Sequence, residues 1–396
     1  SSIILSPKFL NFTTSSNIAC LPTEILANQH FKSLSELLID YDVKVDLLTG
    51  SSKTRERNLI HSNLLNGKTN ILVGTHAILE DVVKFKNLGL SIIDEQHRFG
   101  VAQRAKLWKK NNPAPHILVM TATPIPRTLA MSLYGDLDIS YIKELPPGRI
   151  TTKTVHKYDR NRLSVFKFLK DQINKGRQVY LVYPLINESE KLDYKDLMDG
   201  YESIVREFPR PDFQVSIVHG KMKAKDKDYE MKRFINQETQ ILVSTTVIEV
   251  GVNVPNASVM VIESAERFGL SQLHQLRGRV GRGNDESYCV LMTKDKLSEE
   301  SKLRIETMVK VSDGFKLAEV DLKLRGPGDM LGTRQSGMLR FKLADIVYDT
   351  EILNNARNSA IKILKTDPRL NKNENLPIRD EISTSSNSKN LWRYIS

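Results

Sequence analysis

The sequence has very little cysteine: Cys20 and Cys289 are the only two in 396 residues. Neither stands at a metal-ligand spacing, and two thiols allow at most one bridge, so a disulfide framework is excluded. Both lie in apolar, strand-like surroundings, which predicts buried thiols in a reducing cytoplasm. No run approaches the ~18 consecutive apolar residues of a membrane span, and no secretory signal is visible. We therefore expect a cytoplasmic protein with no membrane partner.

Acidic residues are outnumbered by basic ones, 47 against 58, which gives a formal net charge of +11. A surplus of this size favours a polyanionic partner, and nucleic acid is the first expectation. A lysine surplus that serves only solubility is the alternative. The chain is 40% hydrophobic and 27% charged, so each domain can bury a sizeable core. At ~150 residues per domain, the length suits two domains and a remainder.

Short apolar runs alternate with helix-like stretches over most of the chain. In the first half, strands are predicted at 43–48, 70–73, 88–93 and 116–120, with helices at 31–40 and 54–66. In the second half, strands are predicted at 178–183, 214–218, 240–244, 258–262 and 287–291. Such alternation predicts an α/β fold whose parallel sheets are covered on both faces. We see no internal sequence repeat, although the two halves could share a fold.

The segment 144–149, Glu-Leu-Pro-Pro-Gly-Arg, has the composition of a linker because its prolines stop any helix. We therefore predict two parallel-sheet domains in tandem, 1–145 and 146–296. The rest, 297–396, is charged and helix-like, with breaks expected at 325–329 and 332–337. After Asp367 the sequence is polar and has little to bury, which predicts a mobile tail.

An acidic pair, Asp94-Glu95, directly follows the apolar run 88–93. Doubly wound sheets bind their ligands at the carboxyl ends of such strands. We predict that Asp94 holds Mg²⁺ through water and that Glu95 polarises an attacking water, as nucleoside triphosphate hydrolysis requires. The alternative is that either is merely a charge at a helix N-terminus.

Gln96 and His97 follow the acidic pair. Both can make neutral, directional hydrogen bonds, so we predict that they bind the nucleotide and relay the state of its γ-phosphate. A structural histidine is the alternative for His97.

A second cluster, 275–283, interleaves arginine with glycine. Arg279 and Arg282 are three residues apart, which predicts that both face one side of a helix. As arginine fingers they would stabilise transition-state charge, an effect worth roughly 10³–10⁵ in rate. Gln275 is expected to join the same site. A basic surface helix is the alternative, but its interleaved glycines would cost ~1 kcal/mol each.

These clusters belong to a set of motifs in a fixed order. The set consists of Pro22-Thr23-Glu24, Gly74-Thr75-His76, Asp94-Glu95-Gln96-His97 with Arg98-Phe99-Gly100, Thr121-Ala122-Thr123-Pro124-Ile125-Pro126-Arg127, His219-Gly220-Lys221, Ser244-Thr245-Thr246 through Gly251, Glu263 to Gly269, and the arginine-glycine cluster. In this set the sequence resembles superfamily 2 helicases and translocases, and within them the RecG family of branch-migrating DNA helicases. The resemblance spans roughly Leu21 to Gly337. It implies two RecA-like domains followed by a helical hairpin and a C-terminal helical region, with ATP and Mg²⁺ as cofactors.

The resemblance also implies roles for individual residues. Those expected to contact DNA or to couple DNA to the nucleotide site are Pro22, Thr23, Glu24, Gly74, Thr75, His76, Thr121, Thr123, Thr245 and Thr246. Gly251 would allow close backbone approach to the nucleotide. The region 312–337 resembles the translocation motif that the family shares with the transcription-repair coupling factor, with Arg325, Arg334 and Gln335 as couplers. Capped helix starts and a structural helix pair are the alternatives.

One element of the family pattern is missing. The phosphate-binding loop needs Gly-x-x-x-x-Gly-Lys-Ser/Thr after a strand. Gly67-Lys68-Thr69 lacks the first glycine, and none of the 21 residues before Pro22 matches. The family's N-terminal wedge domain is absent too, and Asn253 stands where Asp is frequent. We therefore expect the C-terminal part of a working helicase, an incomplete motor that binds nucleotide poorly.

The resulting hypothesis is an ATP-dependent DNA helicase or translocase that remodels branched DNA, by fork regression and Holliday junction branch migration, in recombination and repair. The resemblance implies branched or duplex DNA as partner, a single-stranded-DNA-binding protein as a further partner, and a monomeric state. One alternative is a non-hydrolysing nucleic-acid-binding module. Another is a translocase like the transcription-repair coupling factor, against which Gln96 and Pro146-Pro147-Gly148 favour RecG.

Overall fold

The structure is a computed structural model that describes residues 15–95, 99, 106–107, 109–122, 140–142, 144, 150–184, 190–245, 254–283, 285–330 and 349–385. At 190–195, 224, 325–330, 350 and 384–385 it describes the backbone alone. Predictions that fall outside the described residues concern Gln96, His97, Thr123, Thr246, Gly251, Arg334 and Gln335, the linker at 144–149 except for Glu144, the break at 332–337 and the side chain of Arg325. The chain divides into two compact units, within each of which residues contact one another more than they contact the other unit. The first consists of 1–123 and 144–312, and the second of 124–143 and 313–396.

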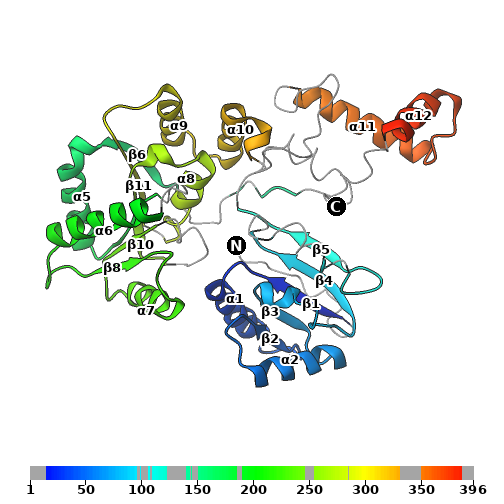
Figure 1. The fold of residues 1–396 in the computed structure, drawn as a ribbon, viewed down its shortest axis with the longest axis horizontal. Helices are drawn as coiled ribbons and strands as arrows, with labels where there is room; N and C mark the ends of the chain where they lie inside the picture. Colours follow the sequence, from blue (N-terminus) through cyan, green and yellow to red (C-terminus); the bar gives the residue numbers. More distant parts are fainter. Residues whose placement is uncertain are drawn as a thin grey trace. The chain divides into compact units, whose positions relative to one another are not determined.

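The first sheet has five parallel strands in the order β2-β3-β1-β4-β5 (Figure 1). They are β1 (Ser16–Cys20), β2 (Val45–Leu48), β3 (Ile71–Gly74), β4 (Leu88–Ile93) and β5 (His116–Val119). Its described helices are α1 (Glu24–Leu37), α2 (Thr54–Asn66) and the short 3-10 helix η1 (His76–Leu79). The predicted strands and the second predicted helix are confirmed.

The two faces of this sheet follow from alternation along β3. Ile71 and Val73 belong to one apolar cluster together with Leu26 of α1. Leu72 points the other way and belongs to a second cluster together with Leu64 of α2. Successive side chains of a strand lie on opposite faces, so α1 and α2 cover opposite sides of the sheet.

Helix α1 begins earlier than predicted, at Glu24. Its start is set by Thr23, whose side chain accepts a hydrogen bond from the amide of Leu26. Helix α2 ends as predicted, because Gly67 adopts a left-handed φ of 70° and closes the helix.

The second sheet has six parallel strands in the order β6-β11-β10-β7-β9-β8. They are β6 (Lys153–Tyr158), β7 (Gln178–Val182), β8 (Val215–Val218), β9 (Ile241–Ser244), β10 (Ala257–Ile262) and β11 (Tyr288–Thr293). Five of them were predicted. The edge strand β6 was missed, since its alternating residues Lys153, Val155 and Lys157 are exposed.

Helices lie between successive strands of the second sheet, and one further helix, α9, follows the last strand β11. They are α5 (Arg162–Asn174), α6 (Glu190–Glu207), α7 (Ala224–Ile235), α8 (Leu270–Arg277) and α9 (Glu299–Lys310), with the short η3 (Asp159–Asn161) and η5 (Ala265–Arg267). One face of the sheet buries Leu169 of α5, Ile204 of α6 and Phe208, which directly follows α6, in a single cluster. On β7, Tyr180 packs against Phe234 of α7 with ring centroids 5.0 Å apart.

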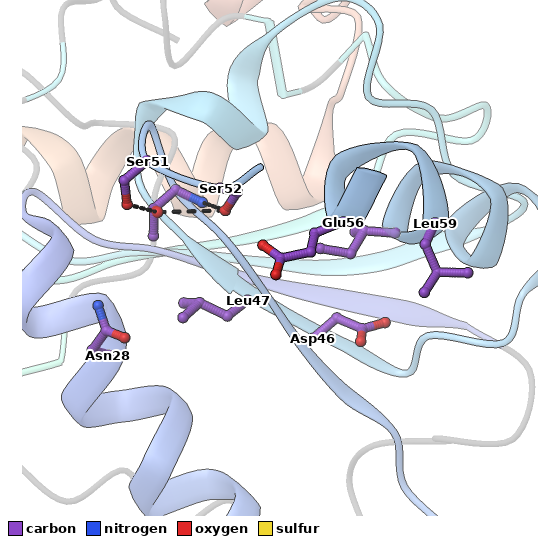
Figure 2. Close-up of a pocket in the computed structure, with 9 residues that line it drawn as sticks. Asn28, Asp46, Leu47, Ser51, Ser52, Glu56 and Leu59 are labelled. Carbon is purple, nitrogen blue, oxygen red and sulfur yellow. Dashed lines mark hydrogen bonds between the residues drawn. The ribbon is translucent and has the colours of Figure 1, made fainter. Parts of the chain in front are cut away.

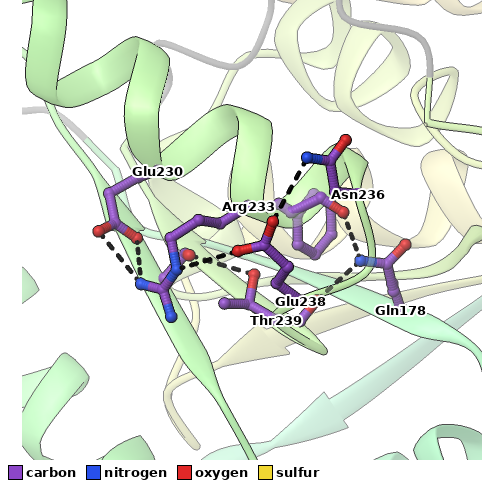
Figure 3. A network of polar contacts seen from close by, with 8 residues as sticks. Gln178, Glu230, Arg233, Asn236, Glu238 and Thr239 are labelled. Carbon is purple, nitrogen blue, oxygen red and sulfur yellow. Dashed lines mark hydrogen bonds and ion pairs between the residues drawn. The ribbon is translucent and has the colours of Figure 1, made fainter.

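The amino end of the second sheet is closed by polar contacts (Figure 3). The Gln178 side-chain amide donates to the carbonyls of Phe234 and Thr239, both at 2.7 Å. Arg233 pairs with Glu230 at 3.2 Å and with Glu238 at 3.8 Å. These groups satisfy one another, which leaves the carboxyl ends of the strands as the edge at which ligands are expected.

In the second unit the described helices are α10 (Gly314–Met330), α11 (Thr350–Thr366), η6 (Asn373–Asn375) and α12 (Leu376–Ser385). The break predicted at 325–329 is wrong, because α10 continues to Met330. Pro327 lies in the last turn, and the preceding turns are held by buried Leu317 and Leu322. Tyr141 and Phe315 add an edge-on ring contact with centroids 5.2 Å apart.

The prediction of a mobile tail after Asp367 is wrong for residues 373–385, which form η6 and α12. The Asp367 carboxylate accepts hydrogen bonds from the amides of Asn371 and Lys372 and from the side chain of Asn375, at 2.8–2.9 Å. One buried carboxylate therefore organises a polar stretch that composition alone did not favour. No helix in the described part of the chain is both long and apolar enough to cross a membrane.

Candidate functional site

The carboxyl edge of the first sheet gathers most of the predicted motifs. Because all five strands are parallel, the segments that follow them emerge at one edge. Backbone hydrogen bonds join these segments in sequence around the edge. They run from Thr75 N to Leu48 O at 3.2 Å, from Leu21 N to Gly74 O at 2.8 Å, from Asp94 N to Cys20 O at 3.1 Å and from Met120 N to Ile93 O at 2.8 Å.

Asp94 and Glu95 lie at this edge directly after β4, the strand between β1 and β5. The Glu95 amide donates to Oδ1 of Asp94 at 2.9 Å. Glu95 adopts φ = 50°, a left-handed conformation that is costly for a non-glycine residue. This conformation brings its Oε2 to 3.3 Å from the amide nitrogen of Ala122, which follows β5. The structure thus joins the acidic pair to the segment that begins at Thr121.

The donor atoms of this pair suit Mg²⁺. Carboxylate oxygens are the hard ligands that Mg²⁺ prefers, and the ion keeps several waters and uses only one or two carboxylates. Within the described residues no group of three or more His, Cys, Asp and Glu side chains could hold a metal ion. An ion at Asp94 would therefore take its remaining ligands from water and phosphate.

His30 of α1 lies within electrostatic reach of Asp94, and the sequence analysis did not select it. Burial lowers the pKa of His30, and the negative charge of Asp94 acts in the opposite direction. A histidine on an amphipathic helix gives no signal in the sequence by which it could have been found.

The predicted DNA-contacting residues of the first sheet differ in exposure. Thr75 is 2% exposed and its Oγ1 is buried, whereas His76 is exposed. Gly74 leaves no room for a side chain, because a Cβ there would lie 1.9 Å from Leu48 O. Glu24 accepts hydrogen bonds from the amide and the hydroxyl of Ser51, both at 2.9 Å.

Ser51 belongs to a turn, Thr49–Lys53, that the sequence analysis did not select. The turn follows β2 at the same edge, and its hydroxyl residues Thr49, Ser51 and Ser52 line a pocket beside Asn28 and Glu56 (Figure 2). The only signal in the sequence was the cluster of small hydroxyl residues after an apolar run.

In the second sheet, Thr245 directly follows β9. It is 2% exposed and its Oγ1 is buried, as is that of Thr75. The hydroxyl of the preceding residue, Ser244, donates to Thr245 O at 2.7 Å.

The prediction that Arg279 and Arg282 share one helix face is wrong. Helix α8 ends at Arg277, and Gly281 has φ = 76°, so the backbone turns between the two arginines. Their charges nevertheless converge. Burial raises the pKa of Tyr180 on β7, and both guanidinium groups act to lower it, so both lie within electrostatic reach of that ring. Gln275 lies in α8 and is half-buried.

Arg277, in the same cluster, has a different environment. It is 6% exposed, and its guanidinium donates to the carbonyls of Met308 at 3.0 Å, Val311 at 2.9 Å and Ser312 at 3.0 Å. These are carbonyls at the C-terminal end of α9, which a nearby arginine can satisfy. Burial lowers the pKa of Arg277. Arg277 therefore satisfies the carbonyls at a helix end, and nothing in the sequence distinguishes this role from a catalytic one.

A buried ion pair lies at the carboxyl edge of the second sheet. Arg162 of α5 donates to Glu263 Oε1 at 2.6 Å and to Oε2 at 2.9 Å, and the Glu263 side chain is 5% exposed. The same guanidinium reaches Asp159 at 2.9 Å. The bidentate contact raises the pKa of Arg162 and leaves Glu263 fully engaged.

Models of three protein families match the chain. A DEAD/DEAH box helicase model matches residues 5–132, and a helicase conserved C-terminal domain model matches 164–284. A model of the C-terminal part of domain 3 of the ATP-dependent DNA helicase RecG matches 311–396. The chain is 50% identical over 358 residues to a protein of Synechocystis sp. named ATP-dependent DNA helicase RecG, an alignment of 90% of this chain and 43% of that protein. The chain belongs to the RecG family of superfamily 2 helicases.

A second RecG relative, from Bacillus subtilis, is 49% identical over 365 residues, which cover 92% of the chain and 53% of the relative. The chain thus spans about half the length of the curated RecG relatives it matches, from 43% to 53% in these two cases.

Solved structures agree with the RecG assignment. A structure of RecG bound to a three-way DNA junction has a TM-score of 0.69 and 42% identity, covering 86% of this chain and 44% of that one. Dbp5 of S. cerevisiae bound to RNA and ADP BeF3 has a TM-score of 0.53 and 14% identity, covering 90% and 83%. That second likeness concerns the fold alone. The predicted tandem RecA-like sheets followed by a helical region are confirmed.

Proposed function

We propose that this chain forms part of an ATP-dependent DNA helicase or translocase that remodels branched DNA, by fork regression and Holliday junction branch migration, in recombination and repair. The observation that carries the proposal is the identity of about one half to RecG relatives over 90% of the chain. The net charge of +11 fits a polyanionic partner. On the same basis we propose a monomer that acts in the cytoplasm, with a single-stranded-DNA-binding protein as a further partner.

ATP and Mg²⁺ are the cofactors we propose. Asp94 would hold Mg²⁺ through water, and the ion, when bound, would neutralise charge that develops on the phosphates. Glu95 would accept the proton of the attacking water. The amide of Ala122 lies 3.3 Å from Oε2 of Glu95 and orients this carboxylate at the carboxyl edge of the sheet.

Arg279 and Arg282 would supply positive charge to the γ-phosphate in the transition state, with Gln275 beside them. The position of Arg277 supports this division of roles. Its guanidinium is held by backbone carbonyls, so it is not available to a phosphate. Gln96, His97 and Gly251 complete the nucleotide site in this proposal.

The DNA side of the proposal uses the loops at the carboxyl edges of both sheets. Backbone amides and small hydroxyl residues suit phosphates and carry no base information. The loop residues proposed for the first sheet are Pro22, Thr23, Gly74, Thr75, His76, Thr121 and Thr123, and those for the second are Thr245 and Thr246. Pro22 has no amide hydrogen and the Oγ1 atoms of Thr75 and Thr245 are buried, so these three would shape the loops and would not donate a side-chain hydrogen bond to a phosphate. Arg325, Arg334 and Gln335 would couple hydrolysis to movement on the duplex.

The sequence contains no Gly-x-x-x-x-Gly-Lys-Ser/Thr loop, so we propose that this chain alone binds nucleotide weakly. The test compares DNA-stimulated ATP hydrolysis by this chain and by a fusion with the upstream motor segment of a RecG relative. We expect turnover mainly in the fusion. Strong turnover by the chain alone would contradict the proposed weakness.

The missing loop also favours a second candidate, a nucleic-acid-binding module that does not hydrolyse ATP. Such a module would bind DNA with a steep salt dependence and without response to ATP, and its fusion would stay inactive. A translocase like the transcription-repair coupling factor would instead be active in the fusion without preference for junctions over plain duplex.

A further inference from the structure

Two ionisable side chains join three loops at the carboxyl edge of the first sheet. Glu24, after β1, accepts hydrogen bonds from the amide of Ser51 with Oε1 and from its hydroxyl with Oε2, both at 2.9 Å. Arg57 of α2 donates to Thr49 O at 2.9 Å and to Glu80 Oε2, beyond η1, at 3.2 Å. The loops after β1, β2 and β3 are therefore tied into one hydrogen-bonded unit, which we call the edge brace.

The turn at the centre of the edge brace is also closed within itself. The amide of Thr49 donates to Ser52 Oγ at 2.9 Å, and the Ser52 amide donates back to Thr49 O at 3.3 Å. The hydroxyls of Thr49 and Ser51 lie 3.1 Å apart. At Gly50, a Cβ would come within 3.2 Å of Glu24 Oε1, so the carboxylate lies against the backbone of the turn.

The charge of Glu24 argues against direct contact with a nucleic acid. An ionised carboxylate can only accept hydrogen bonds, and it repels a phosphate. Each of its two oxygens already accepts a bond from Ser51. A carboxylate within a segment proposed to face phosphates therefore serves the shape of the neighbouring turn.

We propose that Glu24 and Arg57 are positioning residues, which hold the loops after β1, β2 and β3 as one preformed surface for the phosphate backbone, and that Glu24 touches no DNA itself. This inference rests on the proposed DNA-binding function and deepens it. Loops that are already ordered lose less conformational freedom on binding, so the edge brace raises affinity without adding a contact.

The test is a double-mutant cycle on the whole chain with a fluorescent DNA duplex, followed by anisotropy at several salt concentrations. We expect Glu24→Ala to weaken binding about fivefold, and the Glu24→Ala/Ser51→Ala double variant to bind no worse than Glu24→Ala, since Glu24 acts through Ser51. Glu24→Gln keeps an acceptor for the Ser51 amide and should recover most of the affinity. The salt slope should fall in Glu24→Ala if phosphate contacts are lost with the turn.

A matched control lies on the same helix. Glu36 is exposed and only pairs with Lys32 at 3.9 Å, so Glu36→Ala removes the same charge outside the edge brace and should leave affinity unchanged or slightly tighter. Arg57→Lys keeps its charge but loses the planar fork, and should weaken binding where Arg55→Lys, on the exposed side of α2, does not.

Two outcomes separate the inference from the function on which it rests. If the parent chain binds the duplex and Glu24→Ala binds it equally well or more tightly, Glu24 is not a positioning residue and the inference is overturned alone. If the parent chain binds no duplex at all, the proposed function fails and the inference fails with it. Faster amide exchange at Ser51 and Ser52 in Glu24→Ala, with unchanged thermal unfolding, would attribute the loss to the turn.

Discussion

The two sheets share a strand order. The first has β2-β3-β1-β4-β5, and the second has β8-β9-β7-β10-β11 with β6 added outside β11. The equivalent strands β3 and β9 are buried throughout and both lead into a buried threonine, Thr75 or Thr245. The halves therefore share a fold, as the sequence allowed, although no internal repeat was apparent.

The match is closer after β4 and β10. Asp94 and Glu263 occupy the same position, and each donates its amide hydrogen to a carbonyl of the central strand, Asp94 to Cys20 at 3.1 Å and Glu263 to Val182 at 2.8 Å. The residues that follow, Glu95 and Ser264, have φ angles of 50° and 47°. The same backbone conformation therefore places an acidic residue at the carboxyl edge of both sheets.

Asp94 and Glu263 differ in the side chains that surround them. Glu263 is held by both arms of Arg162 and is buried, whereas Asp94 is half-exposed and is followed by a second carboxylate. An acid that is paired in this way is neutralised and cannot serve a metal ion. The two edges therefore share a local backbone conformation, and the side chain that pairs with the acidic residue determines whether that residue can bind a metal ion.

The largest expected effect lies at the paired positions Glu95 and Ser264. In the fusion with an upstream motor segment, Glu95→Gln should lower DNA-stimulated ATP turnover about 10²–10⁴-fold, since the amide cannot accept a proton. Ser264→Ala, at the equivalent position, should leave turnover nearly unchanged. Both variants are compared by steady-state hydrolysis at saturating ATP. Equal losses in the two would contradict a single catalytic edge.

The next effect concerns the ion pair that distinguishes the second edge. Arg162→Ala leaves Glu263 buried and unpaired, and should lower the free energy of unfolding by about 3–5 kcal/mol. Replacing both residues by leucine should restore much of it. Arg160→Ala is the control, because Arg160 pairs with Asp295 on the surface at 3.4 Å and should cost about 0–1 kcal/mol. Denaturant unfolding of the four proteins gives the comparison.

A smaller effect comes from the last residues of β3 and β9. Gly74→Ala should destabilise the first sheet by about 1–3 kcal/mol or more, because the new Cβ would lie 1.9 Å from Leu48 O and must displace β2. Ser244→Ala, at the equivalent place, loses only the hydrogen bond to Thr245 O and should cost about 1 kcal/mol. A harmless Gly74→Ala in thermal unfolding would show that the two strand ends are interchangeable.

The smallest expected effect lies outside both sheets, at Asp367, and supplies a baseline. Hydrogen bonds from Asn375, Lys372 and Asn371 lower the pKa of Asp367 in the folded protein. A lowered folded pKa means that the stabilisation is complete above the unfolded pKa of about 4 and is lost as pH falls through the folded pKa. The melting temperature of α12, followed by circular dichroism, should decrease as the pH drops below about 4 in the parent chain. In Asp367→Asn the melting temperature should depend less on pH.

Much of the fold was predictable because most of its inner strands are apolar on both faces, but β1, the middle strand of the first sheet, was not predicted because it begins with the polar residues Ser16 and Asn17. Continuous apolar runs of this length can be identified as strands from the sequence alone. Because parallel strands all end at the same edge, the segment that begins at Asp94 is then predicted to lie at the carboxyl edge of the sheet. Edge strand β6 escaped because alternating exposed residues weaken the signal. The end of α8 escaped because it depends on the left-handed φ of Gly281 and on Arg277 finding carbonyls more than 30 residues away. The hydrogen bonds of Glu24 were not predicted for the same reason, because their partner Ser51 lies in a turn that follows a different strand, β2.

The position of Arg277 has a mechanical consequence. Its guanidinium holds the carbonyl of Ser312, the last residue of the first unit, while its own backbone is two residues from Arg279. The end of the first unit is therefore hydrogen-bonded to the segment that carries the arginine cluster. If the arginine cluster moves farther than a hydrogen bond can stretch, either Ser312 moves with it or the hydrogen bond between Arg277 and Ser312 breaks.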